Sequence, residues 1–467
     1  MSEQLRHTAL PVSQSRSTLL PLLRRLHFYI GLFIAPFIFI AALTGTLYVL
    51  TPQLEKALYH HQLFTASRGT DQPLSAQVAR ASAWTGPAMT IVAVRPAPQD
   101  GQTTRVMFSR PGLGPSESQA VFIDPKTLEV RGSLTVYGTS GILPLRTWLD
   151  YLHRSLLLGE VGRHYSELAA SWLWIAALGG ALLWASRRAP RRRTRATPTR
   201  AQRLAGLRHW HSTLGLVLLL GLVFFSATGL TWSRWAGDNI AQLRSHFGWL
   251  TPAVNTALQP HAGMTMPMDE HAGHQGHGMM AHDAPAVAVQ PAQFDSVLSA
   301  ARAAGIDAAK LEIRPAYRAD KAWTVSEIDR RWPTRVDSVA VNPLNHQVID
   351  KVTFAQYGLL AKLTRWGVDA HMGVLFGLAN QLVLAAFGLG LCVMIVMGYR
   401  MWWLRRPAAG RVAPGDTLRG CWRELSPRAR ILVGAVTAIA AVSLPVMGAS
   451  LLVLLVIDAW RWRRVAA

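Results

Sequence analysis

The chain has 467 residues, half of them apolar, and a formal net charge of +22. A soluble chain of this length would form two or three domains, but here the apolar residues gather in long runs. Four runs, about 26–50, 166–185, 211–233 and 375–403, are each long enough to cross about 30 Å of hydrocarbon as a helix. This pattern excludes a soluble protein and predicts an integral membrane protein, mainly α-helical, whose first partner is the lipid bilayer.

The positive charge lies in the short segments between these runs. Nine arginines fall within 187–208, and others lie at Arg24, Arg25 and within 405–430. Arginine-rich short loops stay in the cytoplasm, so we expect the N-terminus inside and the long segments 51–165 and 234–370 outside, in the periplasm. The pattern therefore predicts a bacterial inner membrane protein and argues against a nucleic-acid partner. Cys392 and Cys421 offer no disulfide framework.

A motif of histidine, glycine and Thr-Gly occurs twice along the chain. Histidine precedes glycine by 4 residues and threonine by 17 in both copies. The copies are His27, Gly31 and Thr44-Gly45, and His211, Gly215 and Thr228-Gly229. Four residues are about one helical turn, so Gly31 and Gly215 share a face with their histidines and leave room there for a flat macrocycle.

The two outer segments repeat one another. In each segment the residue pattern predicts one helix on a small antiparallel sheet. A hairpin turn is predicted at Asp124-Pro125 in the first segment and at Asn342-Pro343 in the second. These turns, and also His153 and His371, are 218 residues apart. We therefore predict a four-helix transmembrane bundle built from two repeats, each with a small α+β outer domain. The last apolar run forms either a hairpin bending near Pro445 or a fifth span.

The predicted segments follow one another along the chain as far as residue 459. They are a cytoplasmic tail (1–23), the first span (24–50), the first outer domain (51–143), an outer helix with the second span (144–186), an arginine-rich loop (187–208), the third span (209–233), an outer segment with a His/Met-rich loop (234–290), the second outer domain (291–357), an outer helix with the fourth span (358–404), a cytoplasmic segment (405–430) and the C-terminal apolar run (431–459).

The histidines form two candidate pairs, His27 with His211 and His153 with His371. A lone histidine at a membrane interface is usually solvated, but two pairs in register favour a shared function. Two imidazoles on facing helices suit the axial positions of haem iron, and one haem or two would fit. Arg154 and Arg163 follow His153 in the sequence, and their side chains would bind either haem propionates or lipid phosphate. His164 is a reserve ligand.

The second outer segment contains a loop rich in histidine and methionine. Its candidate ligands are His261, Met264, Met266, Met268, His271, His274, His277, Met279, Met280 and His282. Thioethers select Cu(I), whereas imidazole also suits Cu(II). The loop predicts metal capture, of copper in the first place; the alternative is a low-complexity linker.

Taken together, these motifs resemble the PepSY-associated transmembrane family, which includes iron-regulated membrane proteins. The matching pieces are Leu26-His27, Gly31-Leu32, Thr44-Gly45, Asp124-Pro125, Leu152-His153-Arg154, Leu158-Gly159-Glu160, His211, Gly215-Leu216, Thr228-Gly229, His371, Gly377 and the segment 448–452. Members include haem-containing inner-membrane reductases of ferric siderophores. The resemblance implies PepSY-type outer domains and a haem b role for the four paired histidines. The His/Met-rich loop departs from this pattern and adds copper as a substrate.

We therefore expect a metalloreductase that passes electrons across the inner membrane to a periplasmic ferric-siderophore or copper complex. No glycine-rich nucleotide fingerprint follows a predicted strand, so the electron donor would be a reduced flavin, a quinol or a partner protein. The alternatives are a non-enzymatic, membrane-anchored PepSY binding or regulatory protein and a periplasmic copper-buffering protein.

Overall fold

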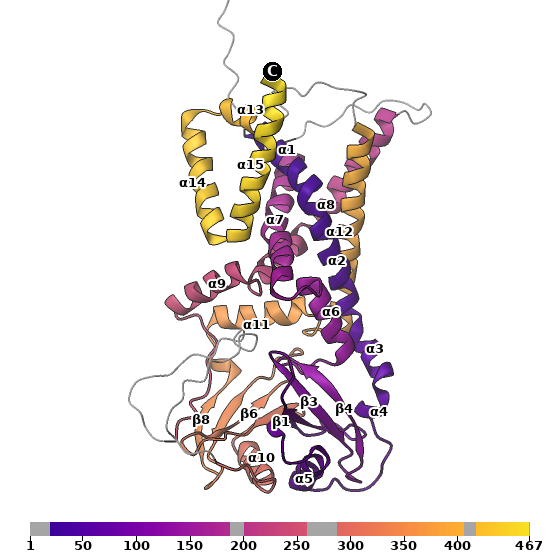
Figure 1. Cartoon of the computed structure of the whole chain (residues 1–467), viewed down its shortest axis with the longest axis vertical. Coiled ribbons are helices and arrows are strands. Elements are labelled where there is room, and N and C mark those ends of the chain that lie inside the picture. Colours follow the sequence, from indigo (N-terminus) through magenta and orange to yellow (C-terminus); the bar gives the residue numbers. More distant parts are fainter. Residues whose placement is uncertain (1–18, 187–199, 259–286, 406–416, 467) are drawn as a thin grey trace, which may run out of the picture. The chain divides into compact units, whose positions relative to one another are not determined.

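The computed structural model describes residues 19–186, 200–258, 287–405 and 417–466 (Figure 1). Internal contacts divide the chain into two compact units. The helical unit comprises residues 1–36, 171–219 and 394–467, and the sheet unit comprises 37–170 and 220–393. The His/Met-rich loop at 261–282 lies outside the described residues.

Five helices of the described chain are long and apolar enough to cross a membrane. They are Leu20–Val49, Gly159–Ala185, Arg200–Leu230, Gly377–Arg405 and Pro445–Arg463. The first four correspond to the runs predicted from hydropathy, and the fifth is the second half of the C-terminal apolar run. Many apolar side chains on these helices face outward, such as Leu220 at 84 % exposure. Large exposed apolar surfaces of this kind require a non-aqueous environment, so the chain is a membrane protein.

The first span is not a uniform α-helix. It consists of α1 (Leu20–Tyr29), a π-helical turn (Ile30–Ile34) and α2 (Ala35–Val49). Pro36 has no backbone N–H, so the carbonyl of Leu32 loses the donor that an α-helix would provide. The hydroxyl of Tyr399 donates to that carbonyl instead, at 2.8 Å. The irregular turn directly follows the helix that carries His27.

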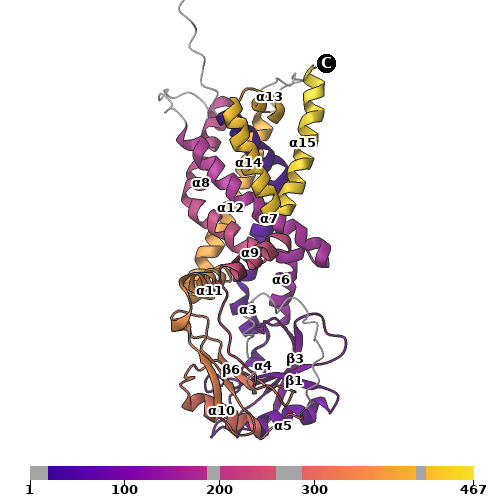
Figure 2. The same cartoon turned by 90° about the vertical axis from the view of Figure 1, so that its left-hand side faces the viewer.

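The helical unit also contains parts of α7 (Gly159–Ala185), α8 (Arg200–Leu230) and α12 (Gly377–Arg405), with α13 (Leu418–Arg423). The C-terminal run forms α14 (Pro427–Ser443) and α15 (Pro445–Ala466), an antiparallel hairpin that bends at Leu444 (Figure 2). A Cβ on Gly448 would come within 2.8 Å of the Ala441 carbonyl oxygen. The two helices of the hairpin are therefore closely packed at their bend.

A buried aspartate fastens this hairpin within the helical unit. Asp458 is 1 % exposed and accepts a hydrogen bond from the Tyr29 hydroxyl at 2.6 Å. It also accepts from the backbone N–H groups of Leu418 and Arg419, the first residues of α13. A carboxylate at a helix N-terminus satisfies donors that have no partner inside the helix. One side chain thus joins α1, α13 and α15.

In the sheet unit, eight strands form one antiparallel sheet in the order β4-β3-β2-β1-β5-β6-β7-β8 (Figure 1). Its strands are β1 (Thr90–Arg95), β2 (Thr104–Ser109), β3 (Glu117–Ile123), β4 (Val130–Tyr137), β5 (Leu311–Arg314), β6 (Trp323–Glu327), β7 (Ser338–Val341) and β8 (Val348–Val352). The sequence predicts a separate sheet for each outer segment. In the structure the two sets of four strands join along β1 and β5.

The joining of the two sets has a clear physical cause. Val94 on β1 pairs with Ile313 on β5, and neither is exposed. Beside them Arg95 and Glu312 form a buried ion pair, with Nε donating to the carboxylate at 2.7 Å. Burial raises the pKa of Glu312, but Arg95 and Arg314 outweigh it and hold the pKa below its usual range. An unpaired edge strand would expose its backbone donors and acceptors, and this pairing removes two such edges.

Helices cover both faces of the sheet. One face packs against α5 (Leu74–Thr85) and α10 (Gln293–Ala303), so Val78 and Phe294 share one core with strands from both sets. The other face of the first set packs against Leu63, the last residue of α4 (His60–Leu63), and against Tyr59, which lies between α3 (Thr51–Leu58) and α4. The core formed with α5 and α10 continues across the junction, so the two outer segments fold as one body.

Besides parts of α2, α7, α8 and α12, the sheet unit contains three further helices. They are α6 (Pro144–Ser155), α9 (Trp235–His246) and α11 (Leu359–His371), the last preceded by a 3-10 turn at Phe354–Gln356. Glu167 is fully buried and accepts from the backbone N–H groups of Trp235 and Ala236, which begin α9. Fully buried Asp369 on α11 binds Arg330 and Arg365. Each buried carboxylate therefore has its partners.

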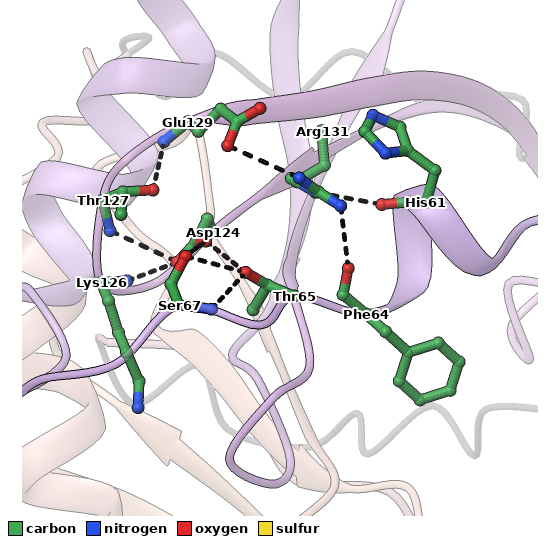
Figure 3. A network of polar contacts seen from close by, with 9 residues as sticks. All are labelled: His61, Phe64, Thr65, Ser67, Asp124, Lys126, Thr127, Glu129 and Arg131. Atoms are coloured by element: carbon green, nitrogen blue, oxygen red, sulfur yellow. Dashed lines mark hydrogen bonds and ion pairs between the residues drawn. The ribbon is translucent and has the colours of Figure 1, made fainter.

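The predicted turn at Asp124 is the centre of a polar network (Figure 3). The buried carboxylate accepts from the hydroxyls of Thr65 and Ser67 and from the backbone N–H groups of Lys126 and Thr127. Burial raises the pKa of Asp124, but these four donors outweigh it and lower the pKa to about 2. Among the described residues, the side chain of the matching Asn342 accepts from one donor, the backbone N–H of Leu344, at 2.9 Å.

We predict that Asp124→Ala lowers the free energy of unfolding by about 2–4 kcal/mol, because four donors lose their acceptor. The folded-state pKa is depressed, so the carboxylate's contribution is complete above the unfolded pKa, about 4, and is lost as pH falls toward 2. Thermal unfolding measured between pH 5 and pH 2 tests this. Asn342→Ala, the control, should cost less and leave the pH dependence unchanged; equal effects would contradict the prediction.

Candidate histidine site

The first histidine pair lies within the helical unit. His27 is near the end of α1 and His211 is on α8, and their ring centroids are 6.5 Å apart. Metal–imidazole bonds are about 2 Å long, so two rings that share one metal ion have centres about 6 Å apart. The observed distance is therefore compatible with one metal ion between the rings.

Glycines lie beside both rings of this pair. A Cβ on Gly180 would stand 3.1 Å from Cε1 of His27, and one on Gly398 would stand 3.8 Å from Cε1 of His211. At Gly31 a Cβ would meet nothing within 4 Å, whereas at Gly215 it would meet the Met394 sulfur at 3.3 Å. The space that the sequence predicts at the two motif glycines is therefore present at Gly31 and limited at Gly215.

The tautomer of His211 follows from its hydrogen bond. Its Nδ1 lies 3.0 Å from the backbone carbonyl oxygen of Met394. A carbonyl oxygen can only accept, so Nδ1 carries the proton, and in the neutral ring Nε2 keeps its lone pair. Metal-binding histidines commonly use this arrangement, which orients the ring and makes Nε2 the ligand. His211 thus has the form that a metal ligand requires.

The second pair lies within the sheet unit and uses the threonines of the repeated motif. His153 on α6 has its Nδ1 3.1 Å from Oγ1 of Thr44, and His371 at the end of α11 has its Nδ1 2.7 Å from Oγ1 of Thr228. The Thr44 hydroxyl donates its proton to the Ile40 carbonyl, at 2.7 Å. That of Thr228 donates to the carbonyl four residues earlier, also at 2.7 Å.

These bonds select the same tautomer as in His211. Each threonine has only one hydroxyl proton, which is already donated, so its oxygen accepts from Nδ1–H of the histidine. Both rings are half-buried, and loss of hydration lowers the pKa of His153 to about 4. Loss of hydration, together with the nearby His153, lowers the pKa of His371 to about 4. Both imidazoles are therefore neutral at pH 7, with the Nε2 lone pair available to a metal ion.

The role of the two threonines was not part of the sequence prediction. The signal was present, because the Thr-Gly pair stands 17 residues after each histidine in both copies. The glycine after Thr44 also has a function: a Cβ on Gly45 would stand 3.1 Å from Cε1 of His153. The first motif therefore contributes both an acceptor and the space for the ring.

The two arginines proposed for haem propionates have protein partners. Arg154 lies 4.0 Å from Asp150 and stacks over the rings of Tyr137 and Tyr151. Arg163 forms an ion pair with Glu160 at 3.5 Å. A propionate would therefore compete with existing interactions at both positions, so their assignment to haem remains a prediction.

The reserve ligand His164 also has partners on both ring nitrogens. Its Nδ1 lies 3.0 Å from the carbonyl oxygen of Val161, and its Nε2 accepts from the Trp235 indole at 3.2 Å. Among the described residues, no group of three or more histidines, cysteines or carboxylates is arranged for a metal ion. The paired histidines are thus the candidate site of the described chain.

A small pocket of about 60 Å³ lies near the second pair, within the sheet unit. Its lining includes Asp150, one helical turn before His153, and Met372, the residue after His371, with Tyr48 and Arg330. Burial raises the pKa of Asp150, although Arg154 and Arg146 oppose it. The pocket is large enough for a few water molecules and is polar enough to hold them.

We predict that Thr44→Val and Thr228→Val each lower the free energy of unfolding by roughly 1–3 kcal/mol, because a partly buried Nδ1–H loses its acceptor. The tautomer of the affected histidine should become mixed, which ¹⁵N NMR of histidine-labelled protein measures. Thr46→Val is the matched control, because Thr46 donates to the Ala42 carbonyl and is on the same helix. Unchanged Nδ1 resonances in the first two variants would contradict the tautomer assignment.

The chain matches the model of the family described as PepSY-associated TM region over residues 24–405. No curated protein matches the chain. The matched region includes all four paired histidines and both threonines, and it covers well over half of the sequence. The chain therefore belongs to the PepSY-associated transmembrane family.

Proposed function

We propose that this protein is a haem b metalloreductase of the bacterial inner membrane, which passes electrons outward to a periplasmic ferric-siderophore or copper complex. One observation supports this most directly. His211, His153 and His371 each have Nδ1 bound to an oxygen acceptor, so each presents the Nε2 lone pair. Histidines that serve only as packing or surface residues have no need of one shared tautomer.

The four histidines would hold haem as two pairs, His27 with His211 and His153 with His371. Haem bound there would supply a one-electron carrier whose potential depends on its axial ligands and burial. The threonine and carbonyl acceptors orient the rings and keep the histidines in the ligand form. The neutral state of the outer pair at pH 7 serves the same purpose, because a protonated imidazole cannot bind iron.

We further propose that the four spans form a bundle of two repeats. The Thr44–His153 and Thr228–His371 bonds are equivalent, and so are the turns at 124–128 and 342–346. Each half contributes four antiparallel strands and one covering helix. The arginine-rich short segments favour a cytoplasmic N-terminus, so the His153 and His371 pair would face the periplasm.

The substrate would remain outside the protein core. A site that encloses a small organic molecule usually measures about 300–1,000 Å³, and the pocket beside Asp150 measures about 60 Å³. A siderophore complex cannot enter it, so the complex would accept electrons at the surface above the second pair. The electron donor would be a reduced flavin, a quinol or a partner protein on the cytoplasmic side.

We predict that the purified protein has the absorption spectrum of bis-histidine haem b. His153→Ala and His371→Ala should each abolish the signal of one haem, and His27→Ala or His211→Ala should abolish that of the other if two haems are present. Pyridine haemochrome analysis gives the number of haems per chain. His164→Ala is the control and should retain the full signal.

Other outcomes favour the alternative functions. A colourless protein that binds copper would support copper buffering in the periplasm. A colourless protein that binds no copper would support a membrane-anchored PepSY binding or regulatory protein. Either result would refute the reductase.

The His/Met-rich loop allows a separate prediction. Replacing residues 261–282 with a Gly/Ser segment of equal length removes its thioether and imidazole ligands, so copper tolerance of the cells and the rate of Cu(II) reduction should both fall. The rate of ferric-siderophore reduction, measured in the same membranes, should not change. If copper tolerance and Cu(II) reduction are unaffected, the loop takes no part in copper capture or reduction.

A further inference from the structure

The helical unit contains a groove of about 400 Å³ between α8 and α12. It is lined by Arg203, Leu207, Arg400, Trp403 and Leu404. Near it Arg200 donates to the carbonyl oxygen of Leu404 at 2.9 Å, which ties the two helices together at this level. The groove is therefore bounded by two membrane-spanning helices.

Among the described residues, no protein group compensates the charge in this groove. Arg203 and Arg400 are both exposed, and within the described chain neither has a hydrogen bond or an ion pair. Other arginines of the helical unit do have partners: Arg430 donates to the carbonyl of Trp422, and Arg419 stacks over Trp462. Two like charges that share one groove repel each other, so the groove favours an anion.

The remaining lining indicates what carries the anion. Leu207 and Leu404 are apolar, and Trp403 is 63 % exposed at the end of a span. Exposed tryptophan at a helix end is typical of the headgroup region of a bilayer. Basic pockets between membrane helices bind anionic headgroups, and the guanidinium fork of arginine matches phosphate geometry.

We propose that this groove binds the phosphate headgroup of an anionic phospholipid. Arg203 and Arg400 hold the phosphate from two different helices, and the glycerol region lies against Leu207 and Trp403. A volume of about 400 Å³ accommodates a headgroup with its glycerol, while the acyl chains extend along the outer surface of the spans. The proposal does not depend on haem.

This lipid would support the first histidine pair. Leu207 stands one helical turn before His211 on α8, and Met394, the acceptor for His211, is on α12. A phosphate bound to Arg203 and Arg400 joins these same two helices. Binding of the lipid to the folded state therefore stabilises the contact between His211 and Met394 by mass action.

Thermal unfolding of the purified full-length protein in neutral detergent tests the proposal, with added phosphatidylglycerol or, as the neutral comparison, phosphatidylcholine. Phosphatidylglycerol should raise the unfolding midpoint, and native mass spectrometry should detect one retained molecule. Arg203→Gln and Arg400→Gln should each weaken its apparent affinity roughly fivefold. Arg203→Lys should recover part of the loss, because it keeps the charge but lacks the fork.

Arg428→Gln is the matched control, since Arg428 is an exposed arginine of the same unit outside the groove. It should bind phosphatidylglycerol as the wild type does. Three results would overturn the proposal: equal stabilisation by phosphatidylcholine, an equal loss in Arg428→Gln, or displacement of phosphatidylglycerol by flavin mononucleotide at lower concentration. The last result would identify the groove as a site for a soluble phosphorylated ligand.

Discussion

The hydrogen bond from histidine Nδ1 to a threonine hydroxyl is the interaction on which the candidate site depends. Thr44 and Thr228 use their only hydroxyl proton within their own helices, so each can serve the histidine only as an acceptor. Desolvation keeps His153 and His371 neutral, and the bond then decides which nitrogen is protonated. Two ordinary constraints, burial and hydrogen-bond satisfaction, together produce an imidazole that is ready to bind a metal ion.

The two halves share this bond but differ in the packing around it. Gly45 allows the ring of His153 to approach the helix, whereas Gly229 lies against Ala170. Around His371, the rings of Phe224 and Phe225 provide the contacts, with centroids 6.3 and 5.6 Å away. The same polar contact thus occurs at Thr44–His153 and at Thr228–His371, although the apolar surroundings of the two histidines differ.

Hydropathy and spacing predicted the spans and the turn at Asp124, because these depend on neighbouring residues or on fixed intervals. The pairing of Val94 with Ile313 could not be predicted in this way, since strands so far apart in sequence choose partners by edge complementarity. The Thr44–His153 bond was missed for a similar reason. The motif marks both residues, but only the packing of α2 against α6 brings their side chains together.

Contacts within the sheet unit also reach the helix that carries His371. Arg330, in the loop after β6, donates to Ser140 in the loop after β4 and to Asp369 on α11. Asp369 is fully buried and stands two residues before His371, so loss of its partners would leave an uncompensated charge beside the site. Through Arg330 and Asp369, the sheet unit therefore helps to hold the helix that carries His371 in place.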